Sequence, residues 1–223
     1  METYAEYVSG LYARDIADGN KCRQLVKKQS DKHSLLVGLL RQVARPGDLV
    51  VAPGSGFGHE QGFFPEFDWL GLEFKSQLVA EATKARKLWG HRGISRQWDV
   101  YQDPLPEGNI LYLCHFCGGG TDFSLFQAAQ KGYRAVVVLS CCSHRMVDLS
   151  LKVHQSRCTS AEWEKLAKLS SRRGTSEGID AQMQIDALRG KLLREQGFTV
   201  SQGWFLDSSL RPLPAGGFII ARR

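Results

Sequence analysis

Two strongly apolar runs in the middle of the chain place the tightest limit on its fold. The runs ILYLCHF (110–116) and AVVVLS (135–140) are flanked by turn residues, and such runs are typical of strands buried on both faces. The segment between them, TDFSLFQAAQKG, has a helical pattern, with Thr121 as its N-cap and Gly132 as its terminator. A helix between two buried strands predicts a parallel pair with a right-handed crossover.

The same alternation extends toward both ends of the chain. We expect helices at 3–17, 31–45 (with Ser30 or Asp31 as the cap), 76–90, 160–170 and 181–197, and strands at 48–52, 69–74 and 94–100, followed by a closing pair, TVSQGWFL and GGFIIARR. This order favours an α/β fold with a Rossmann-like sheet of seven strands, the last one antiparallel, as in class I methyltransferases. With 223 residues, we expect a helical N-terminal extension (1–45) and one methyltransferase domain (46–223) with a polar insertion at about 146–180.

A glycine-rich loop directly follows the first predicted strand of this domain. The residues of the loop that we expect to line a ligand site are Gly54, Ser55, Gly56 and Gly58. Glycines here let the backbone approach a ligand closely at a switch point of the sheet. His59 occupies the last glycine position of the pattern GxGxxG, which disfavours a dinucleotide pyrophosphate site.

Two carboxylates stand where the next two predicted strands end. Glu73 is placed to accept the ribose hydroxyls of a nucleoside, and Asp99 to meet an adenine amino group. With the glycine loop, they resemble the S-adenosylmethionine (SAM) pocket of class I methyltransferases. Those enzymes usually carry an acid two residues before the first glycine, where this chain has Ala52. Glu60 is a candidate to compensate, and a non-catalytic relative is the alternative interpretation.

Four of the six cysteines fall in two clusters, CHFC (114–117) and CCSH (141–144). Both clusters lie at the ends of adjacent predicted strands, so their cysteines and histidines are expected to converge, together with Arg145. Zinc binding is disfavoured because strand alternation points Cys114 and His115 to opposite faces, and no metal is predicted. A cysteine nucleophile for C5 methylation of a pyrimidine is disfavoured because the Pro-Cys and Thr-Cys contexts of such enzymes are missing.

The residues around these clusters resemble one methyltransferase family. The pattern H-F-C-G-x-x-T-D (115–122), followed by C-C-S-H-R (141–145), is similar to that of the eukaryotic tRNA ribose 2′-O-methyltransferases that modify nucleotide 4 of the acceptor stem. The resemblance is dense over about 115–146. Ser143 and Met146 depart from that pattern, and the zinc fingers that precede the domain in those enzymes are missing. A looser version of the pattern occurs in related methyltransferase domains.

The resemblance implies methyl transfer from SAM to a ribose hydroxyl of tRNA. His115, Cys117 and Gly118 would surround the methionine part of SAM. Asp122 and His144 are the candidates for the catalytic base, and Arg145 would hold a phosphate. The Asn/Asp-Pro-Pro-aromatic signature of amino-methylating enzymes is missing, which argues against N-methylation of a base.

The charge pattern is compatible with an RNA partner. Three basic segments, 21–45, 75–96 and 141–173, carry more positive charge than the net +6 of the chain, which acidic residues elsewhere offset, and such segments suit a polyanion. A methyltransferase-fold subunit that binds RNA without catalysis is the main alternative, and a methyltransferase for small molecules or proteins is the third. A chain of this length leaves no room for a separate recognition domain, so a protein partner could supply substrate recognition.

The N-terminus predicts an intracellular protein of the cytoplasm or nucleus. The first 19 residues are acidic and aromatic, unlike a signal peptide or a mitochondrial presequence. No apolar run approaches the roughly 18 residues that a membrane span needs, so no membrane partner is expected. In that compartment the cysteines are expected to be reduced thiols.

Overall fold

The computed structural model describes residues 6, 9, 10, 13, 19–114, 116–141, 143–172, 174–207, 209 and 212–223. Most of the helix expected at 3–17 lies outside these residues. The two predicted site residues His115 and Cys142 also lie outside them.

Seven strands form one sheet in the described part of the chain. They are β1 (Leu49–Pro53), β2 (Asp68–Glu73), β3 (Ile94–Gln97), β4 (Ile110–Cys114), β5 (Ala135–Leu139), β6 (Thr199–Leu206) and β7 (Pro212–Arg222). Their order is β3-β2-β1-β4-β5-β7-β6. Strands β1 to β5 pair in parallel, whereas β7 is antiparallel to both β5 and β6. The predicted seven-stranded sheet with an antiparallel last strand is therefore confirmed.

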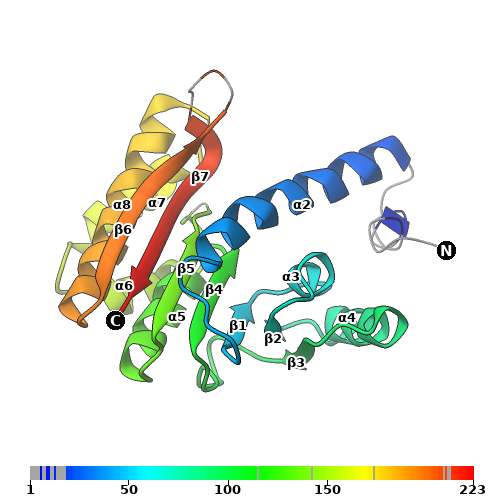
Figure 1. Cartoon of the computed structure of the whole chain (residues 1–223). Helices are drawn as coiled ribbons and strands as arrows, with labels where there is room; N and C mark the ends of the chain where they lie inside the picture. The colour runs from blue at the N-terminus through cyan, green and yellow to red at the C-terminus, as the bar shows by residue number, and fades with distance from the viewer. Residues whose placement is uncertain are drawn as a thin grey trace.

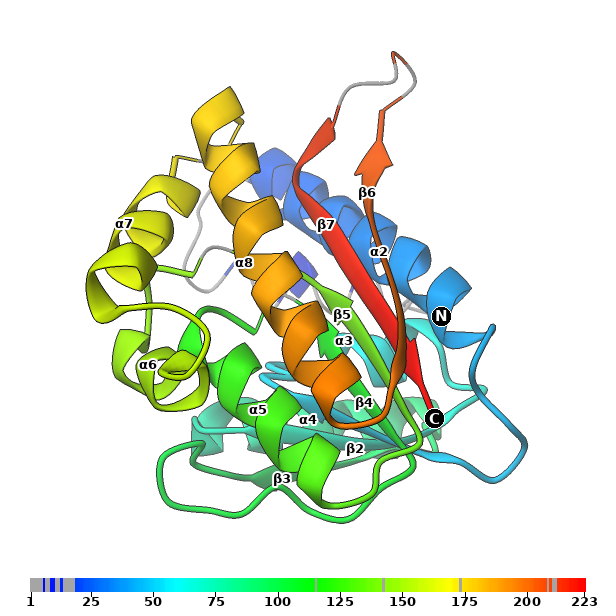
Figure 2. The ribbon, with the colours of Figure 1, turned by 90° about the vertical axis from the view of Figure 1, so that its left-hand side faces the viewer.

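Helices cover both faces of this sheet (Figures 1 and 2). They are α2 (Gly19–Leu40), α3 (His59–Phe63), α4 (Ser76–Trp89), α5 (Gly119–Gln130), α6 (Val147–His154), α7 (Ser160–Ser170) and α8 (Ser176–Glu195). Helices α5, α6 and α8 lie on one face, and α2, α3 and α4 lie on the other. Among the described residues, no helix combines the length and apolar character that crossing a membrane requires.

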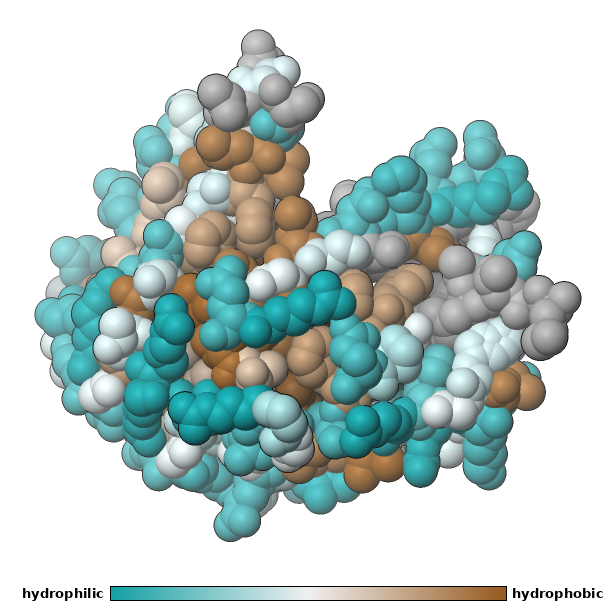
Figure 3. Space-filling view, in the orientation of Figure 1, coloured by the Kyte–Doolittle hydropathy of each residue, from teal (hydrophilic) through white to brown (hydrophobic). Residues whose placement is uncertain are grey.

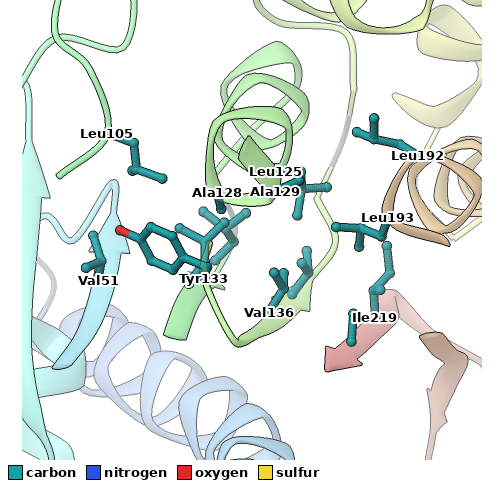
Figure 4. Close-up of a cluster of buried hydrophobic side chains, with 14 of the residues drawn as sticks. Val51, Leu105, Leu125, Ala128, Ala129, Tyr133, Val136, Leu192, Leu193 and Ile219 are labelled. Atoms are coloured by element: carbon teal, nitrogen blue, oxygen red, sulfur yellow. The ribbon is translucent and has the colours of Figure 1, made fainter. Parts of the chain in front are cut away.

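Most of the core lies in two large apolar clusters, one on each face of the sheet, and a smaller third cluster surrounds Trp163 between α7 and α8. Val51 of β1 and Leu125 of α5 belong to the larger cluster (Figure 4), and Leu111 of β4 is a member of the same cluster. Their chain neighbours Val50 and Ile110 point to the opposite face and join the cluster under α2. This alternation explains why the central strands read as continuous apolar runs, since both of their faces are buried.

Helix α2 begins earlier than the sequence predicts, at Gly19 and not near residue 31. Asp31 does not cap a helix, because it lies within α2 and pairs with Lys27 at 2.7 Å, one turn before it. Leu36 and Leu40 are fully buried against the sheet. Packing of this apolar stripe decides the position of the helix more strongly than the local preference of Asp for a cap.

The polar segment at 146–180 forms helices α6 and α7 and the start of α8. Thr159 and Glu162 form a capping box that begins α7, and Trp163 on the same helix is fully buried. Several predicted boundaries were wrong, including the starts of α8 at Ser176 and of β7 at Pro212. The strand expected to reach residue 100 ends at Gln97, and α5 begins at Gly119, before the predicted cap Thr121.

Candidate functional site

Two cavities meet at the carboxyl edge of the sheet, on either side of Gly54. The first has a volume of about 250 Å³ and lies beyond the ends of β2 and β3. Its walls include the aromatic residues Phe74, Trp98, Tyr101 and Phe116 together with Leu72, Val100 and Met146. The carboxylates that line it are Glu73 and Asp99. The cavity is thus a mainly apolar slot with two acceptor groups, which suits a nucleoside.

Backbone hydrogen bonds fix the positions of both carboxylates. Glu73 accepts hydrogen bonds from the backbone N–H of Gly56 at 3.0 Å, and from that of Lys75 at 3.0 Å. Oδ1 of Asp99 accepts a hydrogen bond from the backbone N–H of Tyr101 at 2.9 Å. The bond from Gly56 connects the glycine loop directly to the end of β2. The structure therefore brings Glu73, Asp99 and the glycine loop together, as the sequence predicts.

Phe116 explains why Gly54 must be a glycine. Gly54 has a φ of +72°, and a Cβ atom added there would lie 2.6 Å from the Phe116 ring. A Cβ atom added at Gly120 would meet the same ring at 2.7 Å. Phe116 thus fills the space between the glycine loop and the first turn of α5. Sequence reasoning missed this residue, although an aromatic side chain inside the H-F-C-G pattern was an available signal.

The second cavity, of about 180 Å³, is more polar than the first. Ser55 and Glu60 line it and are only 6% and 2% exposed. Ser55 Oγ and Glu60 Oε1 make no hydrogen bond with any atom of the described residues. Burial raises the pKa of Glu60 to about 8, although hydrogen bonds from its own backbone N–H and from the Gln61 side chain act to lower it; the charge of Glu73 adds slightly to the rise. Such buried polar atoms are the kind that a ligand satisfies.

Helix α2 supplies one wall of the second cavity. His33, on α2, places its Nδ1 2.7 Å from the hydroxyl of Tyr112, on β4. The ring of His59 lies near that of His33, with 6.2 Å between the ring centroids, and burial lowers the pKa of His59 to about 4. The predicted N-terminal extension thus contributes to the candidate site, which the sequence did not indicate.

The loops that follow β4 and β5 pack tightly against each other. Gly118 has a φ of +61°, and a Cβ atom added there would lie 1.7 Å from the backbone oxygen of Arg145. The backbone N–H of Gly119 donates to that same oxygen at 2.9 Å. The Sγ atoms of Cys117 and Cys141 are 3.1 Å apart. The structure therefore brings the two cysteine clusters together at these residues, whereas Cys114 lines the second cavity.

His144 and Arg145 are exposed on the loop after β5. Neither residue is among those that line the two cavities. Both lie on the carboxyl edge of the sheet, where an acceptor would approach. Among the described residues, no group of three or more histidine, cysteine or carboxylate side chains is arranged to hold a metal ion.

Asp122 is placed differently from the expected catalytic base. It is fully buried, and its carboxylate is engaged by Arg189 Nε at 2.7 Å, Ser150 Oγ at 2.5 Å and His154 Nε2 at 3.1 Å. Burial alone would raise the pKa of Asp122, but the charge of Arg189 and these hydrogen bonds outweigh it and lower the pKa. This position does not fit direct contact with a substrate.

Arg189 is the centre of this buried network. Besides Asp122, its guanidinium donates to Asp186 Oδ1 at 3.0 Å and to Ser143 Oγ at 3.3 Å. Ser143 lies next to His144 on the loop after β5. The network therefore connects α5 and α8 to the loop that carries His144 and Arg145. Nothing in the sequence around Arg189 indicated this role.

Known proteins resemble the chain in structure and not in sequence. No family model and no curated protein sequence matches it. The structure of magnesium protoporphyrin IX methyltransferase (ChlM) from Synechocystis PCC 6803 with bound SAH has a TM-score of 0.55 and 16% identity, and the match covers 89% of this chain and 84% of that one. The SAM-bound form of that enzyme has a TM-score of 0.55 and 15% identity, with 92% and 83% covered. A proposed RNA methyltransferase from Pyrococcus horikoshii has a TM-score of 0.50 and 12% identity, with 88% and 81% covered.

These likenesses establish the fold. The sheet order and the antiparallel last strand of this chain are those of the SAM-dependent methyltransferase fold. The three structures include a porphyrin enzyme and a proposed RNA enzyme, so they do not single out an acceptor.

Proposed function

We propose that this chain binds SAM and transfers its methyl group to RNA, with a ribose 2′-hydroxyl of tRNA as the acceptor. The observation that carries the cofactor assignment is the pair of cavities that meet at Gly54. The first cavity suits the adenosine part, with Glu73 accepting the ribose hydroxyls and Asp99 the adenine amino group. The second suits the amino-acid part, because its buried Ser55 and Glu60 have polar atoms to satisfy.

The residues present fit such a cofactor in shape as well as in chemistry. Gly54 and Gly56 have positive φ values, which glycine adopts without strain, and apolar side chains form most of the wall of the first cavity. When bound, SAM supplies an activated methyl group for transfer to a nucleophile. The protein's part would consist mainly of positioning the two reactants and excluding water.

Exposed basic side chains on two helices support RNA as the acceptor. Lys84, Arg86 and Lys87 are exposed on α4, and Lys21, Arg23 and Lys27 are exposed on α2. Figure 3 shows the hydrophilic surface along α2. Lysine and arginine neutralise phosphates, and this contribution dominates the affinity for nucleic acids. The resemblance of residues 115–122 and 141–145 to tRNA ribose methyltransferases favours the 2′-hydroxyl.

The proposed roles of the acceptor-side residues follow from their positions. The exposed Arg145 would hold a phosphate of the RNA bidentately, and His144 beside it would accept the proton of the ribose hydroxyl. Asp122 would act as a positioning residue, because Arg189 links it to Ser143 in the same loop.

Calorimetry with SAM, followed by incubation of the protein with labelled SAM and total tRNA, tests this function. We expect the protein to bind SAM and label tRNA, and Asp99→Ala to weaken SAM binding. His144→Ala should lower the methylation rate about 10²- to 10⁴-fold while SAM binding is retained. SAM binding without labelling of any RNA would overturn the RNA assignment and favour a small molecule or a protein as acceptor.

One observation favours a second function, that of an RNA-binding subunit with this fold and no catalysis. Ala52, at the end of β1, places a buried methyl group where related enzymes usually have an acid. A chain with this function would bind RNA with strong salt dependence and show no heat of SAM binding at millimolar concentration. The same calorimetry therefore separates the two functions.

A further inference from the structure

The second cavity holds an acidic group, Glu60, beside which the described residues place no lysine or arginine. Glu60 is 2% exposed, lines the cavity, and has an Oε1 atom that makes no hydrogen bond with any described atom. Among the described residues, neither a lysine nor an arginine lines this cavity. An ionised carboxylate at such a depth is unstable unless a positive charge or strong donors accompany it.

The other titratable groups that line the cavity are two histidines, a tyrosine and a cysteine. His59 is neutral at pH 7, because burial lowers its pKa to about 4. His33 is hydrogen-bonded through Nδ1 to Tyr112, and burial raises the pKa of Tyr112 well above its ordinary value. Cys114 completes the set, and its thiol would contribute no positive charge. A positively charged group of a bound ligand would therefore meet Glu60 without competition from a lysine or arginine of the described residues.

The position of the cavity indicates which ligand group reaches it. Gly54 lines both cavities, so a molecule with its adenosine part in the first cavity extends past Gly54 into the second. Ser55 lines the same cavity as Glu60, with a buried Oγ atom that makes no hydrogen bond with a described atom. Ala52 lines the same cavity and has no polar side-chain atom to offer.

We propose that Glu60 binds the α-ammonium group of the methionine part of SAM, with Ser55 Oγ as a second acceptor. The proposal rests on the proposed function, since it takes SAM as the ligand. Ala52, near the end of β1, offers no acceptor for the ammonium group in this chain, and Glu60 on the short helix α3 would take that role. Burial of the resulting ion pair away from water would make the contact strong, because charged hydrogen bonds are stronger in such surroundings.

A thermodynamic cycle with two ligands and two proteins tests the proposal. The ligands are S-adenosylhomocysteine and its deamino analogue 5′-S-(3-carboxypropyl)-5′-thioadenosine, which lacks only the ammonium group. The proteins are the full chain and its Glu60→Gln variant, and calorimetry gives the four dissociation constants. We expect loss of the ammonium to weaken binding at least about tenfold in the wild type and less than about twofold in Glu60→Gln.

Each other result overturns the proposal. Equal affinities of the two ligands for the wild type would show that the ammonium has no charged partner. If loss of the ammonium weakens binding by the same factor in the wild type and in Glu60→Gln, the ammonium contacts a different residue. The same conclusion follows if Glu60→Gln weakens the binding of both ligands by the same factor. 5′-Methylthioadenosine, which has no amino-acid part, should bind both proteins alike, and Glu66→Gln, an exposed glutamate that pairs with Arg41, is the matched control.

Failure of the proposed function gives a different pattern. If the wild type binds none of these adenosine ligands, SAM is not its cofactor. If the wild type binds them all and Glu60→Gln changes nothing, the cofactor assignment stands and only the role of Glu60 is lost.

Discussion

Asp122 and Arg189 form an ion pair of 2.7 Å in which both side chains are almost completely buried, although 67 residues separate them in the chain. Asp122 lies in the first turn of α5, the helix that follows β4, and Arg189 lies on α8. The pair also reaches Ser143, so it links the two loops on which the proposed acceptor site stands.

Replacing Arg189 with methionine should destabilise the protein strongly. The substitution leaves the buried carboxylates of Asp122 and Asp186 without their shared cation, which typically costs about 3–5 kcal/mol in the free energy of unfolding. Chemical denaturation at pH 7 measures this loss. Arg194→Met, an exposed arginine on the same helix, is the control and should change stability by less than about 0.5 kcal/mol. A loss at Arg189 no larger than in this control would refute the structural role of the network.

Stability should depend on pH through Glu60. The folded protein keeps the Glu60 proton up to a pKa of about 8, whereas the unfolded chain releases it near the ordinary value of 4.5. The stability of the apo protein should therefore fall as the pH rises from 6.5 to 8, by up to about 1.4 kcal/mol per pH unit. Glu60→Gln should remove this decline, as measured by denaturant midpoints across the range. A decline of the same size in the variant would contradict this account.

His59 should act in the opposite direction at lower pH. Burial lowers its pKa to about 4 in the folded state, while the unfolded chain takes up the proton near 6.5. Its contribution to stability is therefore complete above pH 6.5 and is lost as the pH falls toward 4. The denaturant midpoints of His59→Gln should lose this dependence relative to the wild type. Parallel curves for the two proteins between pH 4 and 6.5 would argue against it.

Alanine at Gly118 should be far more harmful than alanine at Gly132. Both glycines have positive φ values, but an added Cβ atom meets the Arg145 oxygen at 1.7 Å at the first position and nothing within 4 Å at the second. Gly132→Ala should cost about 1–2 kcal/mol from backbone strain alone. Gly118→Ala should cost more and also weaken SAM binding, because the two loops must separate. Denaturation and calorimetry on both variants check this, and equal costs would contradict the close packing of the loops.

Phe74 should contribute to binding of the adenosine part. Its side chain lines the first cavity and is 63% exposed, so it is available to pack on a ligand. Phe74→Ala should raise the dissociation constant of S-adenosylhomocysteine about tenfold, since aromatic contacts contribute roughly 0.5–1.5 kcal/mol beyond area burial. Leu88→Ala, which removes another exposed apolar side chain from the neighbouring helix α4, should leave the constant unchanged. Equal affinities of both variants would place the adenosine elsewhere.

The sequence by itself determined the order of the strands along the chain and the position of the glycine loop. Apolar runs and the turn residues that flank them are local signals, and β2, β4 and β5 lie within two residues of the predicted strands. Glu73 and Asp99 could be placed because they follow strands whose carboxyl ends share one edge of a parallel sheet. The topology of the sheet therefore places both carboxylates at the predicted ligand site.

Only the tertiary structure decided which polar residues face the cavities and which are buried beneath them. Asp122 belongs to a motif that predicts chemistry, yet Arg189 from a distant helix holds it inside the protein. Glu60 and His33 lie in no strand and in no recognisable pattern, but α3 and α2 pack so that both line the second cavity. Whether a side chain is buried, and which residues it contacts, depends on segments far away in the sequence. A local sequence pattern therefore does not reveal it.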